Sequence, residues 1–81
     1  MTEVPEIVYR GELPPYLQVA AWLRSRIESG ELAPGDVLPS EKELTDVTGL
    51  ARITVRKAVR VLREEGLVYT VAQRGTYVAR R

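Results

Sequence analysis

Two helical patterns separated by a short turn constrain the fold of this 81-residue chain more than any other feature of its sequence. Ser40 precedes the first pattern and Glu43 stands three residues later, which is the spacing of a capping box at a helix start. Gly49 ends this pattern, and the second runs from about Arg52 to Glu65. The apolar residues of the second pattern recur at helical spacing: Val55, Ala58, Val59 and Leu62. Two short helices joined by a tight turn that contains glycine predict a helix-turn-helix.

A longer helix is predicted before this pair. Pro15 suits the first position of a helix, and Gly30 suits its end. The apolar face of this helix consists of Tyr16, Val19, Ala20, Leu23 and Ile27. In the short helix after the capping box, we expect Leu44 and Val47 to supply the buried side. The three helices can therefore share one core.

A β-hairpin is predicted after the helices. Residues 67–71 and 76–79 are rich in β-branched and aromatic side chains, and a short turn with Gly75 separates them. The sequence thus predicts a mainly α fold with a small β-hairpin wing, a winged helix-turn-helix of three helices plus a two-stranded wing, over residues 15–81. Residues 1–14 have no helical period and are expected to form an extended or mobile N-terminal arm.

The residue types that are absent exclude several classes of function. The chain has no cysteine and no histidine, which removes thiolate metal sites, thiol nucleophiles and the commonest general base. The carboxylates are scattered over predicted loops and exposed faces, so we predict a protein that is not an enzyme and holds no metal or cofactor. The sequence shows neither an apolar run of membrane-spanning length nor a signal-peptide pattern, so a cytoplasmic location without a membrane partner is expected.

Charge is distributed unevenly along the chain, although the net charge is only +1. Residues 1–50 carry four basic and nine acidic side chains, whereas residues 51–81 carry eight basic and two acidic ones. This asymmetry favours an anionic partner for the second half. A solvated basic face without a partner would account for it equally well.

The basic residues of the second half form a ridge on its predicted helix, because Arg52, Arg56 and Arg60 stand four residues apart. In a helix-turn-helix the second helix enters the major groove of DNA, and its N-terminal residues meet base edges. Arg52 and Arg56 are therefore candidates for reading bases, since the planar fork of arginine matches the two acceptors of guanine. Ile53 is the apolar residue at this exposed start. Thr54 is short enough to contact a phosphate or a thymine methyl.

Two further places could contact the DNA backbone. Ser40 and Lys42 lie at the start of the short helix, where free backbone N–H groups favour anions. Ser40 could equally serve only as a cap, and Lys42 could be only solvated. In the hairpin turn, Arg74 beside Gly75 would lie at the wing tip and could reach a minor groove or the backbone, or simply be exposed.

The order and spacing of these residues resemble the signature of the GntR family of bacterial transcription regulators. Residues 30–44 read G-E-L-A-P-G-D-V-L-P-S-E-K-E-L and resemble the family's segment G-x-L-x-P-G-x-x-L-P-S-E. Residues 51–62 read A-R-I-T-V-R-K-A-V-R-V-L and resemble its recognition-helix pattern S-R-x-T-V-R-x-A-x-x-x-L. Residues 65–67 and 74–78 are similar to its Glu-Gly-Leu and G-x-G-T-F/Y-V wing patterns. The likeness extends over roughly residues 14–79.

The resemblance implies a sequence-specific DNA-binding transcription regulator, often a repressor, that binds an operator as a homodimer and is nucleoid-associated. It gives DNA-contact roles to Lys42, Arg52, Thr54, Arg56, Gln73, Arg74 and Gly75. Ala51 stands where the family usually has Ser or Thr, and Gln73 stands where the first wing glycine is expected. Family members typically carry a C-terminal domain that binds a small-molecule effector, so an effector is expected only if such a domain is missing from this chain.

A second class of function is a winged helix that docks on a protein. Such a module would need an exposed apolar patch on its third helix, where this sequence has basic residues with Ile53 as the exception. An arginine stripe is also common on ordinary exposed helices, and Glu64 and Glu65 could pair locally with Arg60. On the second helix of a helix-turn-helix, the stripe favours DNA recognition.

Overall fold

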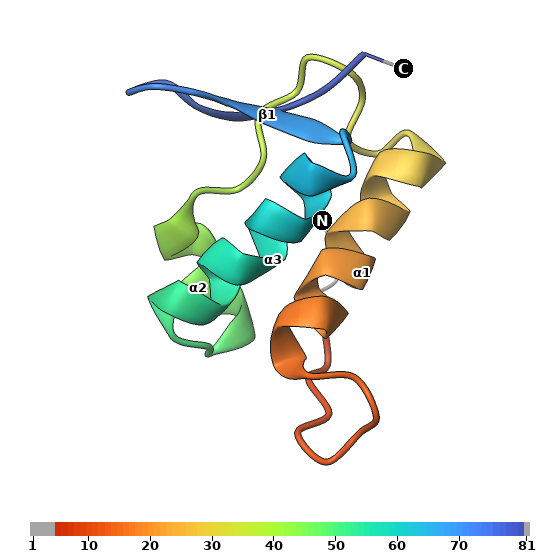
Figure 1. Cartoon of the computed structure of the whole chain (residues 1–81), viewed down its shortest axis with the longest axis vertical. Helices are drawn as coiled ribbons and strands as arrows, with labels where there is room; N and C mark the ends of the chain where they lie inside the picture. Colours follow the sequence, from red (N-terminus) through yellow and green to blue (C-terminus); the bar gives the residue numbers. More distant parts are fainter. Residues whose placement is uncertain (1–4, 81) are drawn as a thin grey trace.

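The computed structural model describes residues 5–80 and has the predicted winged helix-turn-helix architecture (Figure 1). Its elements follow in the order α1 (Pro15–Ser29), α2 (Glu41–Thr48), α3 (Arg52–Glu64), β1 (Val68–Val71) and β2 (Gly75–Val78). Figure 1 shows α3 between α1 and α2, with the hairpin lying across one end of the helices. Residues 1–4 of the predicted arm, and Arg81, lie outside the described residues.

Local sequence signals set the ends of the helices. Ser40 Oγ accepts a hydrogen bond from the Glu43 N–H (3.1 Å), and the Glu43 carboxylate accepts one from the Ser40 N–H (2.8 Å), which confirms the predicted capping box. Gly30 and Gly49 follow α1 and α2 with φ angles of 87° and 73°, which glycine adopts without steric cost. By contrast, α3 begins after Ala51, whose side chain makes no capping hydrogen bond.

One apolar core lies between the helices and the hairpin. Its largest fully buried side chains are Leu23, Leu44, Leu62, Val19, Val55 and Val78. Val59 is only partly buried at the edge of this core. The prediction that Val47 is buried is wrong, since it is 41% exposed and Thr48 lies in the core instead. The four-residue spacing from Leu44 places Thr48 on the buried side of α2, and its hydroxyl is satisfied because it donates to the Leu44 carbonyl (2.6 Å).

The wing is attached to the start of α2 through the preceding loop. The antiparallel strands β1 and β2 pair Val68 with Val78. On the other edge of β2, the Leu38 N–H donates to the Thr76 carbonyl and the Val78 N–H donates to the Asp36 carbonyl, both at 2.8 Å. Because Leu38 is also buried in the core, the hairpin and the N-terminal end of α2 hold a fixed relative position.

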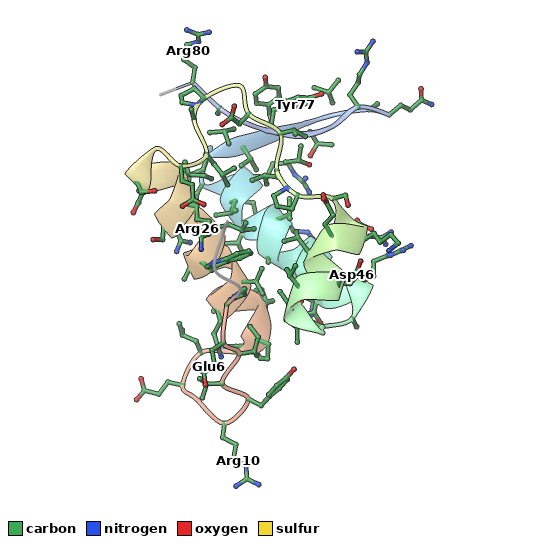
Figure 2. The ribbon with its side chains drawn as sticks, turned by 180° about the vertical axis from the view of Figure 1, so that it is seen from behind. Glu6, Arg10, Arg26, Asp46, Tyr77 and Arg80 are labelled. Carbon is green, nitrogen blue, oxygen red and sulfur yellow. The ribbon has the colours of Figure 1, made fainter. Side chains whose placement is uncertain are left out.

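Residues 5–14, the described part of the predicted arm, form a turn-rich loop before α1. The Gln18 side chain accepts a hydrogen bond from the Val8 N–H (2.8 Å) and donates to two carbonyl groups of the loop (2.7 Å each). Figure 2 shows Arg10 at the outer end of this loop and Arg80 at the opposite end of the molecule. The loop is therefore tied to the first turns of α1, far from the wing.

An ion pair joins the C-terminal end of α3 to α1. Arg24 donates through Nε to Glu65 Oε1 (2.9 Å) and through Nη2 to Glu65 Oε2 (2.7 Å). The alternative of a local pair between Glu65 and Arg60 is therefore wrong, because five residues separate them and helix neighbours lie three or four apart. The hydrogen bond from Arg24 lowers the pKa of Glu65 and raises that of Arg24.

The lowered pKa of Glu65 predicts a stability difference that depends on pH. A carboxylate with a lowered folded-state pKa stabilises the fold above its unfolded pKa, and this contribution is lost as pH falls through the folded pKa. Glu65→Gln should be less stable than wild type near neutral pH, by less than about 1 kcal/mol because the pair is partly exposed. Urea unfolding from neutral to acidic pH should show the two proteins converging. A difference that persists in acid, or an equal loss in Glu64→Gln, would contradict this role.

The uncapped start of α3 predicts a stabilising substitution. Ala51 has the extended backbone of an N-cap residue, with φ −65° and ψ 154°, but no hydroxyl to accept from the first-turn N–H groups. Ala51→Ser should therefore stabilise the domain by about 1 kcal/mol, measured as a higher urea midpoint. Ala72→Ser, which adds the same hydroxyl to the exposed hairpin turn, serves as the control and should change little. An unchanged midpoint for Ala51→Ser would show that this N-cap position does not limit stability.

Candidate nucleic-acid interface

The two faces of α3 differ sharply. One face contributes three completely buried side chains to the core: Val55, Ala58 and Leu62. On the other face, the side chains of Arg52 and Arg56 are 63% and 59% exposed, and Ile53 is 66% exposed. Thr54, between these faces, is partly buried. The face of α3 opposite the core therefore exposes Arg52, Ile53 and Arg56 near the start of the helix.

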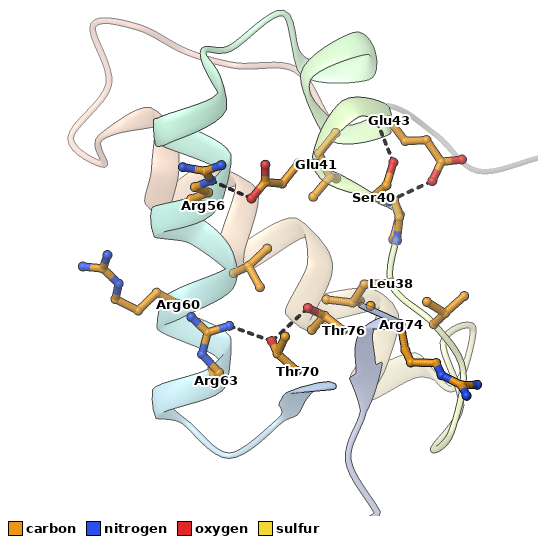
Figure 3. A pocket seen from close by; sticks show the side chains of 15 residues that line it. Leu38, Ser40, Glu41, Glu43, Arg56, Arg60, Arg63, Thr70, Arg74 and Thr76 are labelled. Carbon is orange, nitrogen blue, oxygen red and sulfur yellow. Dashed lines mark hydrogen bonds and ion pairs between the residues drawn. The ribbon is translucent and has the colours of Figure 1, made fainter. Parts of the chain in front are cut away.

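A carboxylate of α2 meets both of these cations. Arg56 Nε donates to Glu41 Oε2 at 2.7 Å, and Arg52 Nε lies 3.6 Å from Glu41 Oε1 (Figure 3 shows the first contact). The hydrogen bond and the negative charge of Glu41 raise the pKa of Arg56, so its guanidinium stays charged under all ordinary conditions. Glu41 thus links the start of α2 to the arginine ridge of α3.

The two candidate residues at the start of α2 have partners within the protein. Ser40 Oγ accepts the capping hydrogen bond, and its O–H can still donate to another group. Lys42 Nζ lies 3.0 Å from Asp46 Oδ2, one turn further along the helix. This pair is highly exposed, so it leaves Lys42 able to exchange its partner for an external anion.

The wing tip is a tight turn with an unusual backbone. The Arg74 N–H donates to the Val71 carbonyl (3.0 Å), which closes the turn. Gln73 has a φ of 64°, a left-handed conformation that glycine adopts more readily. Gly75 has a φ of 135°, and a Cβ there would lie 3.3 Å from Val37 Cγ2. Glycine at position 75 is therefore required by the local geometry, whereas Gln73 is held in a strained conformation.

A groove of about 540 Å³ lies between the start of α2, the side of α3 and the hairpin (Figure 3). Four arginines line it: Arg56, Arg60, Arg63 and Arg74. The carboxylates of Glu41 and Glu43 stand at its α2 side, and Leu38, Leu44 and Val59 contribute its apolar surface. The groove therefore has a cationic wall that reaches from α3 to the wing.

This groove gathers only part of the predicted site. Among the candidates, Ser40, Arg56, Arg74 and Gly75 line it, whereas Lys42, Arg52, Ile53, Thr54 and Gln73 lie outside it. Arg63 and Thr70 were not among the candidates, yet Arg63 Nη1 donates to Thr70 Oγ1 (2.8 Å), and Thr70 Oγ1 lies 3.0 Å from Thr76 Oγ1. The pairing of two threonines across a predicted hairpin is the signal that could have suggested this polar contact.

Two negative findings concern residues 5–80. No group of three or more acidic side chains lies close enough together there to hold a metal ion. Over the same residues, no helix has the length and apolar character needed to cross a membrane.

Comparison with known protein families and sequences gives consistent matches. The model of a family described as bacterial regulatory proteins, gntR family, matches residues 15–78. The chain is 43% identical over 68 residues to the HTH-type transcriptional repressor NagR of Bacillus subtilis, and 44% identical over 68 residues to the mannosyl-D-glycerate transport/metabolism system repressor MngR of Escherichia coli. Each match covers 84% of this chain and 28% of the relative, so the chain spans less than a third of the length of these relatives.

Solved structures are similar as well. The chain superimposes on the DNA-binding domain of AraR, in a crystal structure of its complex with operator ORX1, with a TM-score of 0.85 and 36% identity, covering 96% of this chain and 100% of that chain. It superimposes on YtrA from Sulfolobus acidocaldarius, a GntR-family transcription factor, with a TM-score of 0.87 and 35% identity, covering 98% and 83%.

The left-handed residue in the wing turn predicts a stabilising glycine. A non-glycine residue in this conformation costs roughly 1–2 kcal/mol, and glycine removes that cost while making the unfolded chain more flexible. Gln73→Gly should therefore stabilise the domain by up to about 1 kcal/mol, measured as the urea midpoint. Ala72→Gly, at the neighbouring turn position without a positive φ, should instead be destabilising or neutral. Loss of stability in Gln73→Gly would show that side-chain contacts outweigh the backbone strain.

Proposed function

This chain belongs to the GntR family of bacterial regulatory proteins, and we propose that it binds operator DNA sequence-specifically as the DNA-binding domain of a transcriptional repressor. The observation that best supports this proposal is the position of Arg52 and Arg56, which lie on the second helix of a helix-turn-helix with largely exposed side chains. Such a helix lies in the major groove with its N-terminal residues at the base edges. The relatives named above support the proposal, because they are described as repressors or as a transcription factor.

Sequence reading is assigned to the first turns of α3. Arg52 and Arg56 each carry a planar fork that can donate to O6 and N7 of guanine. Ile53 is exposed between them and could contact a thymine methyl group, and Thr54 could contact a thymine methyl group or a phosphate. These contacts would read one operator half-site.

Anchoring to the DNA backbone is assigned to the residues around the groove. Ser40 and Lys42 lie at the N-terminal end of α2, where free N–H groups and the helix dipole favour a phosphate. Arg60 and Arg63 line the groove beside α3. The wing residues Gln73, Arg74 and Gly75 would contact the backbone or the minor groove, because a turn of this size presents Arg74 beyond the end of the strands.

The proposal extends to the assembly on DNA. A homodimer on an inverted repeat would read two half-sites and gain affinity through the high effective concentration of the second domain. The match covers the whole AraR DNA-binding domain, which was crystallised with its operator. This likeness supports a DNA-binding role for the domain described here. We assign no small-molecule effector to residues 5–80, because the groove lined by Arg56, Arg60, Arg63 and Arg74 lies on the proposed DNA side. A protein with this function acts in the cytoplasm at the bacterial nucleoid.

Binding to a duplex selected from a random library tests this function. Fluorescence anisotropy of the labelled duplex, titrated at several salt concentrations, should show binding that weakens steeply with salt. Arg52→Ala and Arg56→Ala should each weaken binding about ten- to hundredfold and relax the preference at one base position. Lys42→Ala should instead weaken binding to all sequences and reduce the salt slope.

The control for these variants is Lys57→Ala. Lys57 lies over the ring of Tyr16 on the α1 side of α3 (5.7 Å to the ring centroid), so its loss removes one positive charge away from the base-reading face. This variant should keep the sequence preference of wild type. Selection that enriches no sequence, even with a forced dimer, would overturn the DNA-binding function and favour a protein-docking module.

A further inference from the structure

The contact of one carboxylate with two base-reading arginines has a consequence for specificity. We propose that Glu41 is a positioning residue that directs the guanidinium groups of Arg52 and Arg56 toward guanine and lowers the affinity of the domain for non-cognate DNA. This inference rests on the proposed DNA-binding function. In this role, an acidic side chain beside the arginines lowers general affinity for DNA and raises the preference for one sequence.

The atoms that make the contact support this role. Both arginines approach Glu41 through Nε, at 2.7 Å for Arg56 and 3.6 Å for Arg52. Within residues 5–80, no hydrogen bond to another protein group engages the terminal nitrogens of either guanidinium. Because guanidinium is planar, a carboxylate at Nε leaves the Nη1–Nη2 edge free and limits how the plane can turn. The free edge is a pair of donors that can meet O6 and N7 of guanine together.

The backbone that carries Glu41 is anchored in the fold. Glu41 is the first residue of α2, directly after the N-cap Ser40 and inside the capping box that Ser40 forms with Glu43. Leu44, three residues later, is completely buried and fixes the rotation of this short helix. A carboxylate in the first turn is also favoured by the helix dipole, so it is stable there before DNA arrives. The guanidinium groups are thus held by a partner that does not itself need to be ordered on binding.

The negative charge of Glu41 weakens binding to every DNA sequence, whereas its orientation of the two guanidinium groups helps binding only to the cognate sequence. A carboxylate near the DNA backbone repels phosphates and offsets part of the attraction of Arg52 and Arg56. On a non-cognate site the forks find no matching acceptors, so the repulsion is not compensated. On the cognate site two oriented arginines reach guanine with little further loss of side-chain freedom. Specificity therefore rises although total positive charge falls.

Glu41→Gln tests the inference, because it removes the charge and keeps the size of the side chain. Affinity should be measured by anisotropy for the selected duplex and for a scrambled duplex of the same length. We expect the variant to bind the scrambled duplex several-fold more tightly and the ratio of the two affinities to fall by about tenfold. The loss of preference should fall on the base positions that Arg52→Ala and Arg56→Ala also relax.

Glu28→Gln is the matched control. It makes the same change of charge on an exposed position of α1, where the charge of Glu28 acts on Arg24 and not on the arginines that contact Glu41. It should strengthen binding to both duplexes slightly and equally, leaving their ratio unchanged. In a background of Arg56→Ala, the effect of Glu41→Gln on the ratio should shrink, since coupled residues are not additive.

A measurement without DNA separates positioning from a general effect on folding. In the free protein, the Arg56 Hε–Nε signal in a nitrogen-15 NMR spectrum should exchange with water more slowly in wild type than in Glu41→Gln. Glu41→Gln should lower the urea midpoint only slightly, because it removes a first-turn carboxylate, and both proteins should be fully folded where exchange is measured. Equal exchange rates, or a wild-type specificity ratio in Glu41→Gln, would overturn the role of Glu41 while leaving the proposed function intact. A wild-type protein without sequence preference would overturn the proposed function and this inference together.

Discussion

The packing of α3 against α1 and α2 fixes which side chains of α3 face solvent. Val55, Ala58 and Leu62 must face the core, which fixes the rotation of α3 about its axis. Once this rotation is fixed, Arg52 and Arg56 on the opposite side must face solvent. A chain of 81 residues without cysteine has no disulfide to add stability, so the burial of this stripe is essential for folding. The same apolar contacts therefore stabilise the fold and aim the arginines outward.

Most of the fold could be predicted because its signals are local. Gly30 and the pair Ser40 and Glu43 act within one turn of helix, so their effect is readable from a few neighbouring residues. The predictions failed where three-dimensional packing determines which side chain is buried or which partner it meets. Whether Val47 or Thr48 enters the core depends on how α2 is rotated against α3, and helical spacing alone allows either within a short helix. Glu65 found a partner on α1, 41 residues away, which no local pattern encodes.

The sequence could name candidate site residues one by one, but it could not show their arrangement in space. Arg52 and Arg56 stand out by their spacing on one helix. The contact of Arg56 with Glu41, 15 residues earlier, depends on the angle between the two helices, and the sequence shows Glu41 only as a first-turn acid. Likewise, Arg63 meets Thr70 because the hairpin folds back against α3, which follows from the path of residues 36–38 beside β2. Long-range contacts between polar side chains are therefore what the structure adds.

These contacts explain how a domain with a net charge of +1 can suit a polyanion. Attraction to phosphates grows with the number of unpaired cations, whereas base reading depends on where two planar groups point. The arginines around the groove fall into these two kinds. Arg56 shares the Glu41 carboxylate with Arg52, which offsets part of its attraction to phosphates and limits how its guanidinium can turn. Arg60 and Arg74 line the part of the groove that would meet the backbone. A chain with more positive charge and no Glu41 would bind DNA more strongly at every site, and a regulator that must find one operator among many sequences requires a difference between sites.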